Sequence, residues 1–271
     1  FQAVMDSKER RQIGAHYTAE KNILKLIRSL FLDDLRAEFE TITADRSTRR
    51  TARLQEFHDK LATLRFLDPA CGCGNFLVLT YRELRKLELE VLLELEHGEI
   101  EGQVQLIEKR KVDVTGLSKL DVDQMSGIEV EEFPARIAEV ALWLTDHQAN
   151  VALSQAFGEF YWRIPLRKSP HIVVGNALRI DWRTVLPPEQ CSFVLGNPPF
   201  VGGKYQTDEQ RADMDVVTAG IQNAGLLDYV ASWYFKAADY IRSTRITVGF
   251  VSTNSITQGE QVGVLWNALF Q

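Results

Sequence analysis

The sequence predicts an α/β protein with a doubly wound, mostly parallel sheet of the Rossmann-like type. Short apolar runs rich in β-branched residues recur without clean alternation, as expected of strands buried on both faces. Helical patterns lie between most of these runs, and strands that alternate with helices form a parallel sheet covered on both sides. The expected strands are residues 65–68, 127–130, 171–174, 192–195 and 246–251.

Helical patterns occupy the segments between the expected strands. Residues 75–111 are rich in Leu, Glu, Lys and Arg, with Gly98 and Gly102 as candidate breaks. Residues 226–241 form an amphipathic stretch ahead of the last strand, and Pro134 suits the first turn of a helix after the second strand. One apolar stripe of an amphipathic helix follows, formed by Ile137, Val140, Ala141 and Leu144.

The part of the chain before the first expected strand is also helical by pattern. We therefore predict an N-terminal helical segment, residues 1–63, followed by the sheet domain, residues 64–271. The chain begins at Phe1 rather than Met and stops at Gln271 within a helical pattern, so we expect it to be part of a longer protein.

Composition is that of a soluble globular protein. Of the 271 residues, 45% are hydrophobic, which is enough for a sizeable core. No apolar run approaches the ~20 residues that span a bilayer. No charged-then-apolar leader is recognisable either, so we expect a cytoplasmic protein without a membrane partner. Cys71, Cys73 and Cys191 make an odd count, and a lone C-x-C is a poor metal site, so we expect neither a disulfide framework nor a metal.

The net charge of −6 argues against a self-sufficient nucleic-acid binder. It does not exclude DNA as a partner, because local basic patches matter more than the total. Residues 8–11 and 46–53 are two such patches, although each taken alone is better explained as a solvated helix face.

The first motif, FLDPACGCGNFL, lies at a strand-to-helix junction, residues 66–77. Gly72 and Gly74 let the backbone turn tightly and approach a ligand, and a helix N-terminus offers free N–H groups to an anion. The third glycine of the dinucleotide fingerprint is missing. Asp68 at the strand end would repel a pyrophosphate but suits a positively charged amino-acid group. A tight turn with no ligand is the other interpretation.

Two weaker motifs follow the next two expected strands. Glu129 ends the second strand, where an acid in nucleoside-binding α/β folds accepts hydrogen bonds from ribose hydroxyls. Glu131 and Glu132 come directly after it, so a solvated acidic cluster is the alternative. Residues 175–178, Gly-Asn-Ala-Leu, with Asp181 beyond them, form an ordinary turn when taken alone.

The most specific motif is LGNPPF, residues 195–200. Two successive prolines fix φ and remove two N–H donors, which leaves backbone carbonyls free to accept hydrogen bonds. The Asn197 amide oxygen beside a rigid carbonyl gives two acceptors for one planar –NH2 group. Two acceptors can draw such an amine toward tetrahedral geometry and free its lone pair for attack. The alternative is a common Asn-Pro turn.

With these motifs in order, the chain resembles the class I S-adenosylmethionine (SAM)-dependent DNA adenine-N6 methyltransferases. The segment with Gly14, Tyr17 and Thr18 is similar to the G-x-x-Y-T element of that family, upstream of the sheet. The resemblance runs from Gly14 to about Thr257. It is closest to the fused type IIG/IIL, MmeI-like restriction–modification enzymes.

The resemblance implies a role for individual residues. Asn197 and the Pro198 carbonyl would hold the target amine, Phe200 would stack on the base, and Pro199 completes the rigid turn. Glu129 would bind the ribose of SAM, and Asn176 stands where the family often has an Asp near the adenine N6. The implied cofactor-binding residues are Gly14, Tyr17, Thr18, Asp68, Pro69, Ala70, Gly72, Gly74, Asn75, Glu129, Asn176 and Ala177.

The resemblance also implies a mechanism and a partner. The target adenine must be flipped out of double-stranded DNA, and the methyl group then passes directly to its amine. A Pro-Cys nucleophile motif is absent from the sequence, which disfavours cytosine-C5 methylation. The closing hairpin and the target-recognition domain of the family would lie beyond this chain. We therefore expect DNA recognition to come from outside it, and SAM binding to be retained more readily than turnover.

Other functions remain open at this stage. Cytosine-N4 methyltransferases and protein-glutamine methyltransferases solve the same chemical problem of a planar amine. A non-catalytic SAM-fold subunit and a dinucleotide dehydrogenase are two further alternatives.

Overall fold

A computed structural model describes residues 18–102, 116–157 and 168–270. Within these ranges the chain forms a five-stranded, all-parallel sheet of order β3-β2-β1-β4-β5. The predicted fold class is confirmed, and every expected strand forms close to its expected bounds. The strands are β1 (Phe66–Asp68), β2 (Met125–Glu129), β3 (His171–Val174), β4 (Phe193–Gly196) and β5 (Thr247–Phe250).

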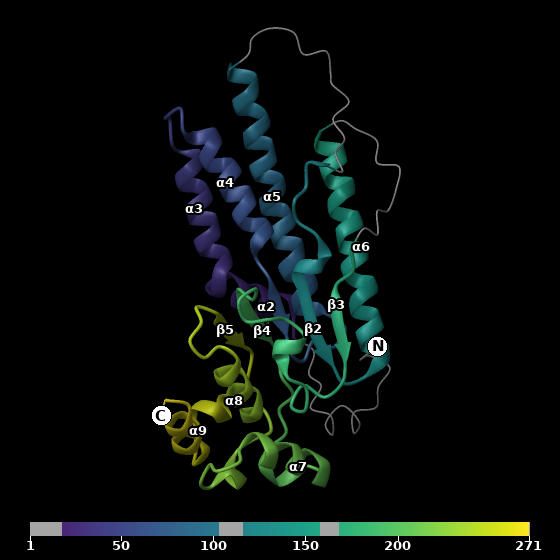
Figure 1. Cartoon of the computed structure of the whole chain (residues 1–271), viewed down its shortest axis with the longest axis vertical. Helices are drawn as coiled ribbons and strands as arrows, with labels where there is room; N and C mark the ends of the chain where they lie inside the picture. The colour runs from purple at the N-terminus through teal and green to yellow at the C-terminus, as the bar shows by residue number, and fades with distance from the viewer. Residues whose placement is uncertain (1–17, 103–115, 158–167, 271) are drawn as a thin grey trace.

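Helices cover both faces of the sheet, which makes it doubly wound. In Figure 1, α3, α4 and α5 rise beyond one end of the sheet, and α7, α8 and α9 gather at the opposite end. The longer helices are α2 (Glu20–Ile27), α3 (Asp33–Thr43), α4 (Arg50–Thr63), α5 (Asn75–Gly102), α6 (Glu132–Ala156), α7 (Asp208–Val217), α8 (Ala231–Tyr240) and α9 (Gln261–Leu269). No helix in the described part of the chain has the length and apolarity needed to cross a membrane.

The helices that precede β1 share one hydrophobic core with the sheet. A short π-helix, η1 (Arg28–Leu32), joins α2 to α3 and directs Phe31 onto the sheet. The Phe31 ring lies 5.1 Å from that of Phe66 on β1 and 5.0 Å from that of Phe193 on β4, measured between centroids. Aromatic contacts of this kind stabilise a core beyond their buried area. A domain boundary after residue 63 stays a prediction.

Two helices differ in detail from the sequence-based expectation. Helix α5 continues through Gly98 as far as Gly102, the last described residue of this segment, so the first candidate break does not interrupt it. The apolar stripe of α6 does not coincide with its buried face, because the Val140 and Leu144 side chains are 59% and 54% exposed.

The reason for the unexpected orientation of α6 is steric. This helix passes so close to the loop after β1 that a Cβ on Gly74 would lie 2.9 Å from Cβ of Ala138. Small side chains such as Ala135 and Ala138 must therefore face the sheet, and both are fully buried. The larger side chains of the stripe are left on the outside.

A buried polar network ties α4 to α5. The Glu88 carboxylate on α5 contacts His58 Nε2 of α4 at 2.8 Å and Arg85 Nε at 3.0 Å. The Ser118 hydroxyl and the Lys119 backbone N–H also donate to it, each at 2.8 Å. Burial alone would raise the pKa of Glu88, but the hydrogen bond from His58 and the charge of Arg85 lower that pKa overall.

Removing the Glu88 carboxylate should therefore destabilise the fold. Glu88→Ala leaves Arg85 with Asp146 as its remaining carboxylate partner but removes the acceptor of the Ser118 hydroxyl and the Lys119 N–H, and we expect the free energy of unfolding to fall by about 1–3 kcal/mol. Because the native pKa is below the unfolded one, the wild-type advantage should be present above about pH 4 and disappear as the pH falls further. Chemical denaturation at several pH values measures both effects.

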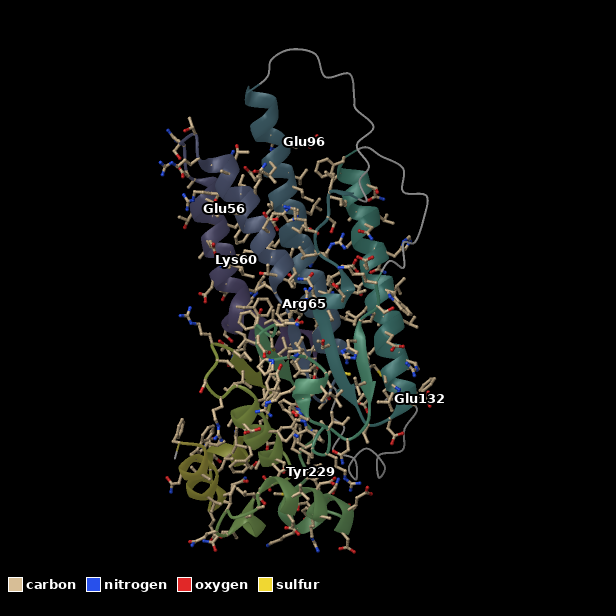
Figure 2. The ribbon with its side chains drawn as sticks, viewed as in Figure 1. Glu56, Lys60, Arg65, Glu96, Glu132 and Tyr229 are labelled. Atoms are coloured by element: carbon tan, nitrogen blue, oxygen red, sulfur yellow. The ribbon has the colours of Figure 1, made fainter. Side chains whose placement is uncertain are left out.

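Glu96→Ala is the matched control, because Glu96 lies on the same helix with an exposed side chain, as Figure 2 shows. Its effect should stay within about 0.5 kcal/mol. Equal effects of the two substitutions would contradict a stabilising role of the network.

Candidate active site

The candidate site lies where the carboxyl ends of the central strands meet. Asp68 ends β1, Glu129 ends β2 and Gly196 ends β4, and the three strands are neighbours in the parallel sheet. Ligands of open α/β sheets bind at this edge, outside the carboxyl ends of the strands. Glu132, which begins α6, and Tyr229 mark this end of the molecule in Figure 2.

Asp68 is a fully buried carboxylate at the centre of this edge. Its Oδ1 accepts a hydrogen bond from the Ala70 N–H at 3.0 Å. Its Oδ2 is also buried and has no hydrogen-bond partner among the described residues. Burial raises the pKa of Asp68 to about 8, and the nearby Glu129 carboxylate raises it further. Such a group is costly unless a donor or a cation reaches it.

The glycine-rich loop after β1 is held in a well-anchored conformation that requires glycine at two positions. Gly72 and Gly74 have φ of +55° and +81°, a region that side chains disfavour. The Gly72 N–H donates to Glu129 Oε2 at 2.8 Å, and the Cys71 N–H donates to the Ile128 carbonyl at 3.0 Å. The loop is therefore fixed against the end of β2 before α5 begins at Asn75.

Glu129 anchors the loop and carries a perturbed carboxyl group. Its Oε1 accepts from the Glu131 N–H at 3.0 Å, in addition to the Gly72 contact of Oε2. Burial raises its pKa, although these hydrogen bonds act in the opposite direction. Two of the sequence-predicted residues, Gly72 and Glu129, are thus brought into direct contact.

Asn176 lies in the turn after β3 and is part of a second polar cluster. Its Oδ1 accepts from the Leu178 N–H at 2.9 Å, and its Nδ2 donates to Asp213 Oδ2 at 2.7 Å. Asp213 on α7 is buried and also accepts from Arg179 Nε at 2.7 Å and from the Tyr229 hydroxyl at 3.2 Å. The neighbouring Ala177 is buried in the core.

The turn after β4 carries the Asn-Pro-Pro-Phe motif. It approaches Asp68 so closely that a Cβ on Gly196 would lie 2.5 Å from Asp68 Oδ1. Asn197 Nδ2 donates to the Thr18 hydroxyl at 2.7 Å, which links this turn to the segment ahead of α2. Pro198 is buried, whereas Pro199 and Phe200 are partly exposed. The remaining residues of the upstream element, Gly14 and Tyr17, lie outside the described residues.

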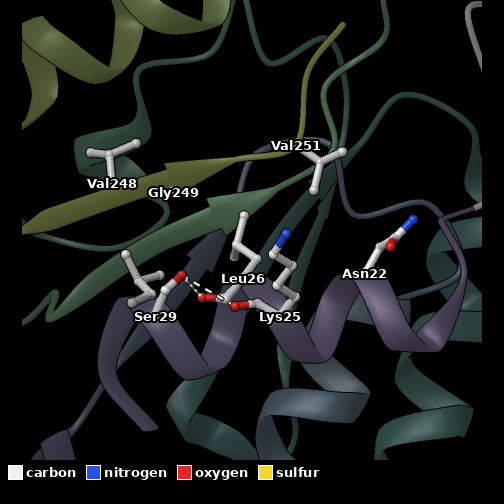
Figure 3. A pocket seen from close by; sticks show the side chains of 8 residues that line it. Asn22, Lys25, Leu26, Ser29, Val248, Gly249 and Val251 are labelled. Carbon is white, nitrogen blue, oxygen red and sulfur yellow. Dashed lines mark hydrogen bonds between the residues drawn. The ribbon is translucent and has the colours of Figure 1, made fainter. Parts of the chain in front are cut away.

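A groove of about 440 Å³ lies to one side of this cluster. Figure 3 shows Asn22, Lys25 and Ser29 facing Gly249 and Val251 across it, so its walls are α2, η1 and the edge strand β5. None of its lining residues is a sequence-predicted site residue, and it contains no carboxylate. The polar strand ends therefore remain the better candidate. Within the described ranges no three His, Cys, Asp or Glu side chains form a group suited to a metal ion.

Several residues outside the sequence-predicted set also shape the site. Val130 follows Glu129 directly and its side chain is 61% exposed, which places an apolar surface beside the buried acid. Trp233 on α8 donates its indole N–H to the Pro69 carbonyl at 3.1 Å and so supports the loop from the other face of the sheet. Of these residues, only Val130 could be found from its own stretch of sequence, because it directly follows the acid that ends β2. Trp233 and Asp213 come from distant segments.

Comparisons with known proteins point in one direction. The family profile described as the DNA-methyltransferase domain of MmeI matches residues 43–271. The DNA methyltransferase A of Bacillus subtilis (strain 168) is 36% identical over 274 residues, which cover 100% of this chain and 29% of that protein. The chain thus spans under a third of the length of this curated relative.

Solved structures give the same picture. The type IIL restriction–modification enzyme MmeI, in complex with DNA, is 54% identical and superposes with a TM-score of 0.90, covering 99% of this chain and 34% of that one. A nuclease-deletion mutant of the type ISP enzyme LlaGI, with a DNA substrate mimic, is 15% identical with a TM-score of 0.52, covering 94% and 19%. The second likeness shows the fold alone.

The buried Asp68 carboxyl should make stability depend on pH. Its native pKa of about 8 lies above the unfolded pKa of about 4. Between about pH 4 and pH 8 the native state therefore retains a proton that the unfolded state has released. The free energy of unfolding should therefore fall as the pH rises from about 4 to 8. Asp68→Asn removes this contribution, and the variant should be more stable than wild type at pH 9 but not at pH 4.

Thermal or chemical denaturation across this pH range measures the effect. Asp215→Asn, at an exposed position on α7, should leave the wild-type pH dependence unchanged. A variant that is less stable than wild type at pH 9 would show that Asp68 does not oppose folding.

Proposed function

The chain belongs to the family of the MmeI DNA-methyltransferase domain, and we propose that it transfers a methyl group from SAM to the N6 amine of an adenine in DNA. We further propose that it does so as part of a restriction–modification enzyme. The observation that carries the proposal is that the Asn-Pro-Pro-Phe turn lies against Asp68. Gly196, the residue directly before the turn, is so close to the Asp68 carboxylate that a Cβ would lie 2.5 Å from Oδ1.

The strand ends fit SAM as the cofactor. Asp68 Oδ2 is a buried acceptor suited to a positively charged ammonium group, and Glu129 ends the next strand, where a ribose would be bound. Gly72 has open space beside its backbone for a ligand, Gly74 lets Ala138 of α6 pack against the loop, and Val130 offers an apolar surface for an adenine ring. The proposed cofactor-binding set is completed by Gly14, Tyr17, Thr18, Pro69, Ala70, Asn75, Asn176 and Ala177. Bound SAM supplies an electrophilic methyl group.

The residues after β4 would then hold the target amine. Asn197 Oδ1 and the Pro198 carbonyl are two acceptors on a rigid turn, so they can accept the two hydrogen bonds that one –NH2 group donates. Drawing the amine toward tetrahedral geometry makes its lone pair available for direct attack, without a covalent enzyme intermediate. Phe200 would stack on the base. The reaction thus depends on positioning.

Double-stranded DNA is the proposed partner. The amine of a paired adenine is unreachable inside a duplex, so the base must be flipped into the site. The MmeI structure that resembles this chain is a complex with DNA, and this chain covers about a third of its length. With a net charge of −6, the chain would rely on sequence recognition by other parts of a longer protein.

Isotopically labelled SAM tests the reaction. The full-length protein is incubated with unmethylated DNA, which is then digested so that the labelled nucleoside can be identified by mass. We expect labelled N6-methyladenine from the wild type and at least ~10²-fold slower labelling from Asn197→Ala, because one of the two acceptors is lost. Asn267→Ala, at an exposed position on α9, is the control and should label DNA normally.

The possible products separate the alternatives. Label on cytosine N4 would keep the mechanism and change the base. A SAM-binding protein that labels protein glutamine and not DNA would overturn the proposal, and one that labels nothing would favour a non-catalytic subunit.

SAM binding itself tests the role of Asp68. Asp68→Asn keeps the shape of the side chain but cannot carry the negative charge that Asp68 has above its pKa of about 8, so we expect the dissociation constant for SAM at pH 9 to rise at least ~10-fold. Isothermal titration calorimetry measures this directly, with Asp215→Asn as the control. Unchanged affinity would exclude Asp68 from the cofactor site.

A further inference from the structure

The amide of Asn197 is held by a residue from the far end of the sequence. Its Nδ2 donates to Thr18 Oγ1 at 2.7 Å, across 179 positions of the chain. The Thr18 side chain is 8% exposed, so this hydrogen bond is largely shielded from water. Thr18 is followed by Ala19, whose carbonyl accepts from the backbone N–H groups of Asn22 and Ile23 at the start of α2. The hydroxyl is therefore attached to a fixed helix end.

Helix α2 and the β4 turn are themselves anchored to the same edge strand. Leu26 of α2 and Leu30 of η1 pack on Gly249 of β5, where a Cβ would lie 3.1 Å from the nearest Leu30 methyl carbon. The Val251 N–H donates to the Gly196 carbonyl at 2.9 Å, directly before Asn197. The segments that carry Thr18 and Asn197 are thus both fixed against β5 and the residue that follows it.

The orientation of this amide decides what Asn197 can do. A carboxamide accepts hydrogen bonds at its oxygen and donates them from its nitrogen, and the two ends have nearly the same shape. An incoming amine brings two donors, so it requires the oxygen. With the amide reversed, Asn197 Nδ2 would face the target amine, and neither group could accept a hydrogen bond from the other. Something must therefore hold the nitrogen away from the target.

We propose that Thr18 is a positioning residue that accepts the Asn197 amide hydrogen and thereby presents Asn197 Oδ1 to the target amine. This inference rests on the proposed function and adds to it, because Thr18 then acts on the rate of methyl transfer and not only on cofactor binding. The two roles are separable. A cofactor ligand changes the affinity for SAM, whereas a residue that orients Asn197 changes the rate at saturating SAM.

Thr18→Val tests the inference in the full-length protein. Valine keeps the shape of threonine and removes the hydroxyl. We expect the single-turnover rate of DNA methylation at saturating SAM to fall about 10- to 100-fold, because the reacting group is misaligned. Because SAM is saturating, a change in its dissociation constant does not contribute to this fall in rate. Thr18→Ser keeps the hydroxyl and should restore most of the rate.

Thr80→Val is the matched control. Thr80 on α5 is fully buried, and its hydroxyl has no hydrogen-bond partner among the described residues. It therefore tests the loss of a buried hydroxyl without a contact to Asn197, and its rate should remain that of the wild type.

A second measurement does not depend on activity. In protein labelled with ¹⁵N-asparagine, Asn197→Ala assigns the Asn197 side-chain NH2 resonances. We expect Thr18→Val, but not Thr80→Val, to move them and to accelerate their hydrogen exchange. An amide oriented the other way would leave its NH2 resonances nearly unchanged.

The outcomes distinguish this inference from the function on which it rests. A wild type that does not methylate DNA would overturn both. A methylating wild type whose Thr18→Val variant keeps the full rate, or loses only SAM affinity, would overturn the role of Thr18 and leave the proposed function intact.

Discussion

The site depends on one close approach, between the end of β1 and the end of β4. Only a residue without a Cβ fits at Gly196, because the place of that atom is 2.5 Å from the Asp68 carboxylate. The buried acid and the Asn-Pro-Pro-Phe turn consequently occupy the same corner of the sheet. Parallel pairing of β1 with β4 fixes this distance, since residues Phe66 and Leu67 lie in register with Phe193 and Val194.

The second feature of the site is a buried acid, Asp68, for which the described residues supply no positively charged partner. Asp68 is buried with one oxygen lacking a described partner, and its neighbour Glu129 is a second acid with a raised pKa. A sequence selected for stability alone would place an apolar side chain or an amide there. Retaining a carboxylate makes physical sense when a cationic ligand completes the site. The cost of the buried acid is offset by the hydrophobic clusters on the two faces of the sheet.

The helices ahead of β1 contribute to the site as well as to the core. Phe31 packs against both central strands, and the same helical segment begins next to Thr18, which contacts Asn197. On the opposite face, Trp233 supports Pro69, and Asp213 gathers Asn176, Arg179 and Tyr229. The loops of the site are thus supported from both layers of helices.

The sequence by itself determined the strands, the fold class and the two turns of the candidate site, because these signals are local. A buried strand, a glycine-rich turn and an Asn-Pro-Pro-Phe turn each depend on a few adjacent residues. Only the tertiary structure decided which face of α6 is buried, because the close approach of Gly74 to Ala138 admits small side chains and leaves Val140 and Leu144 outside. It also decided that Thr18 meets Asn197 and that Asp213 meets Asn176. Such pairs are set by how distant segments pack against the sheet, and no periodicity within either segment encodes them.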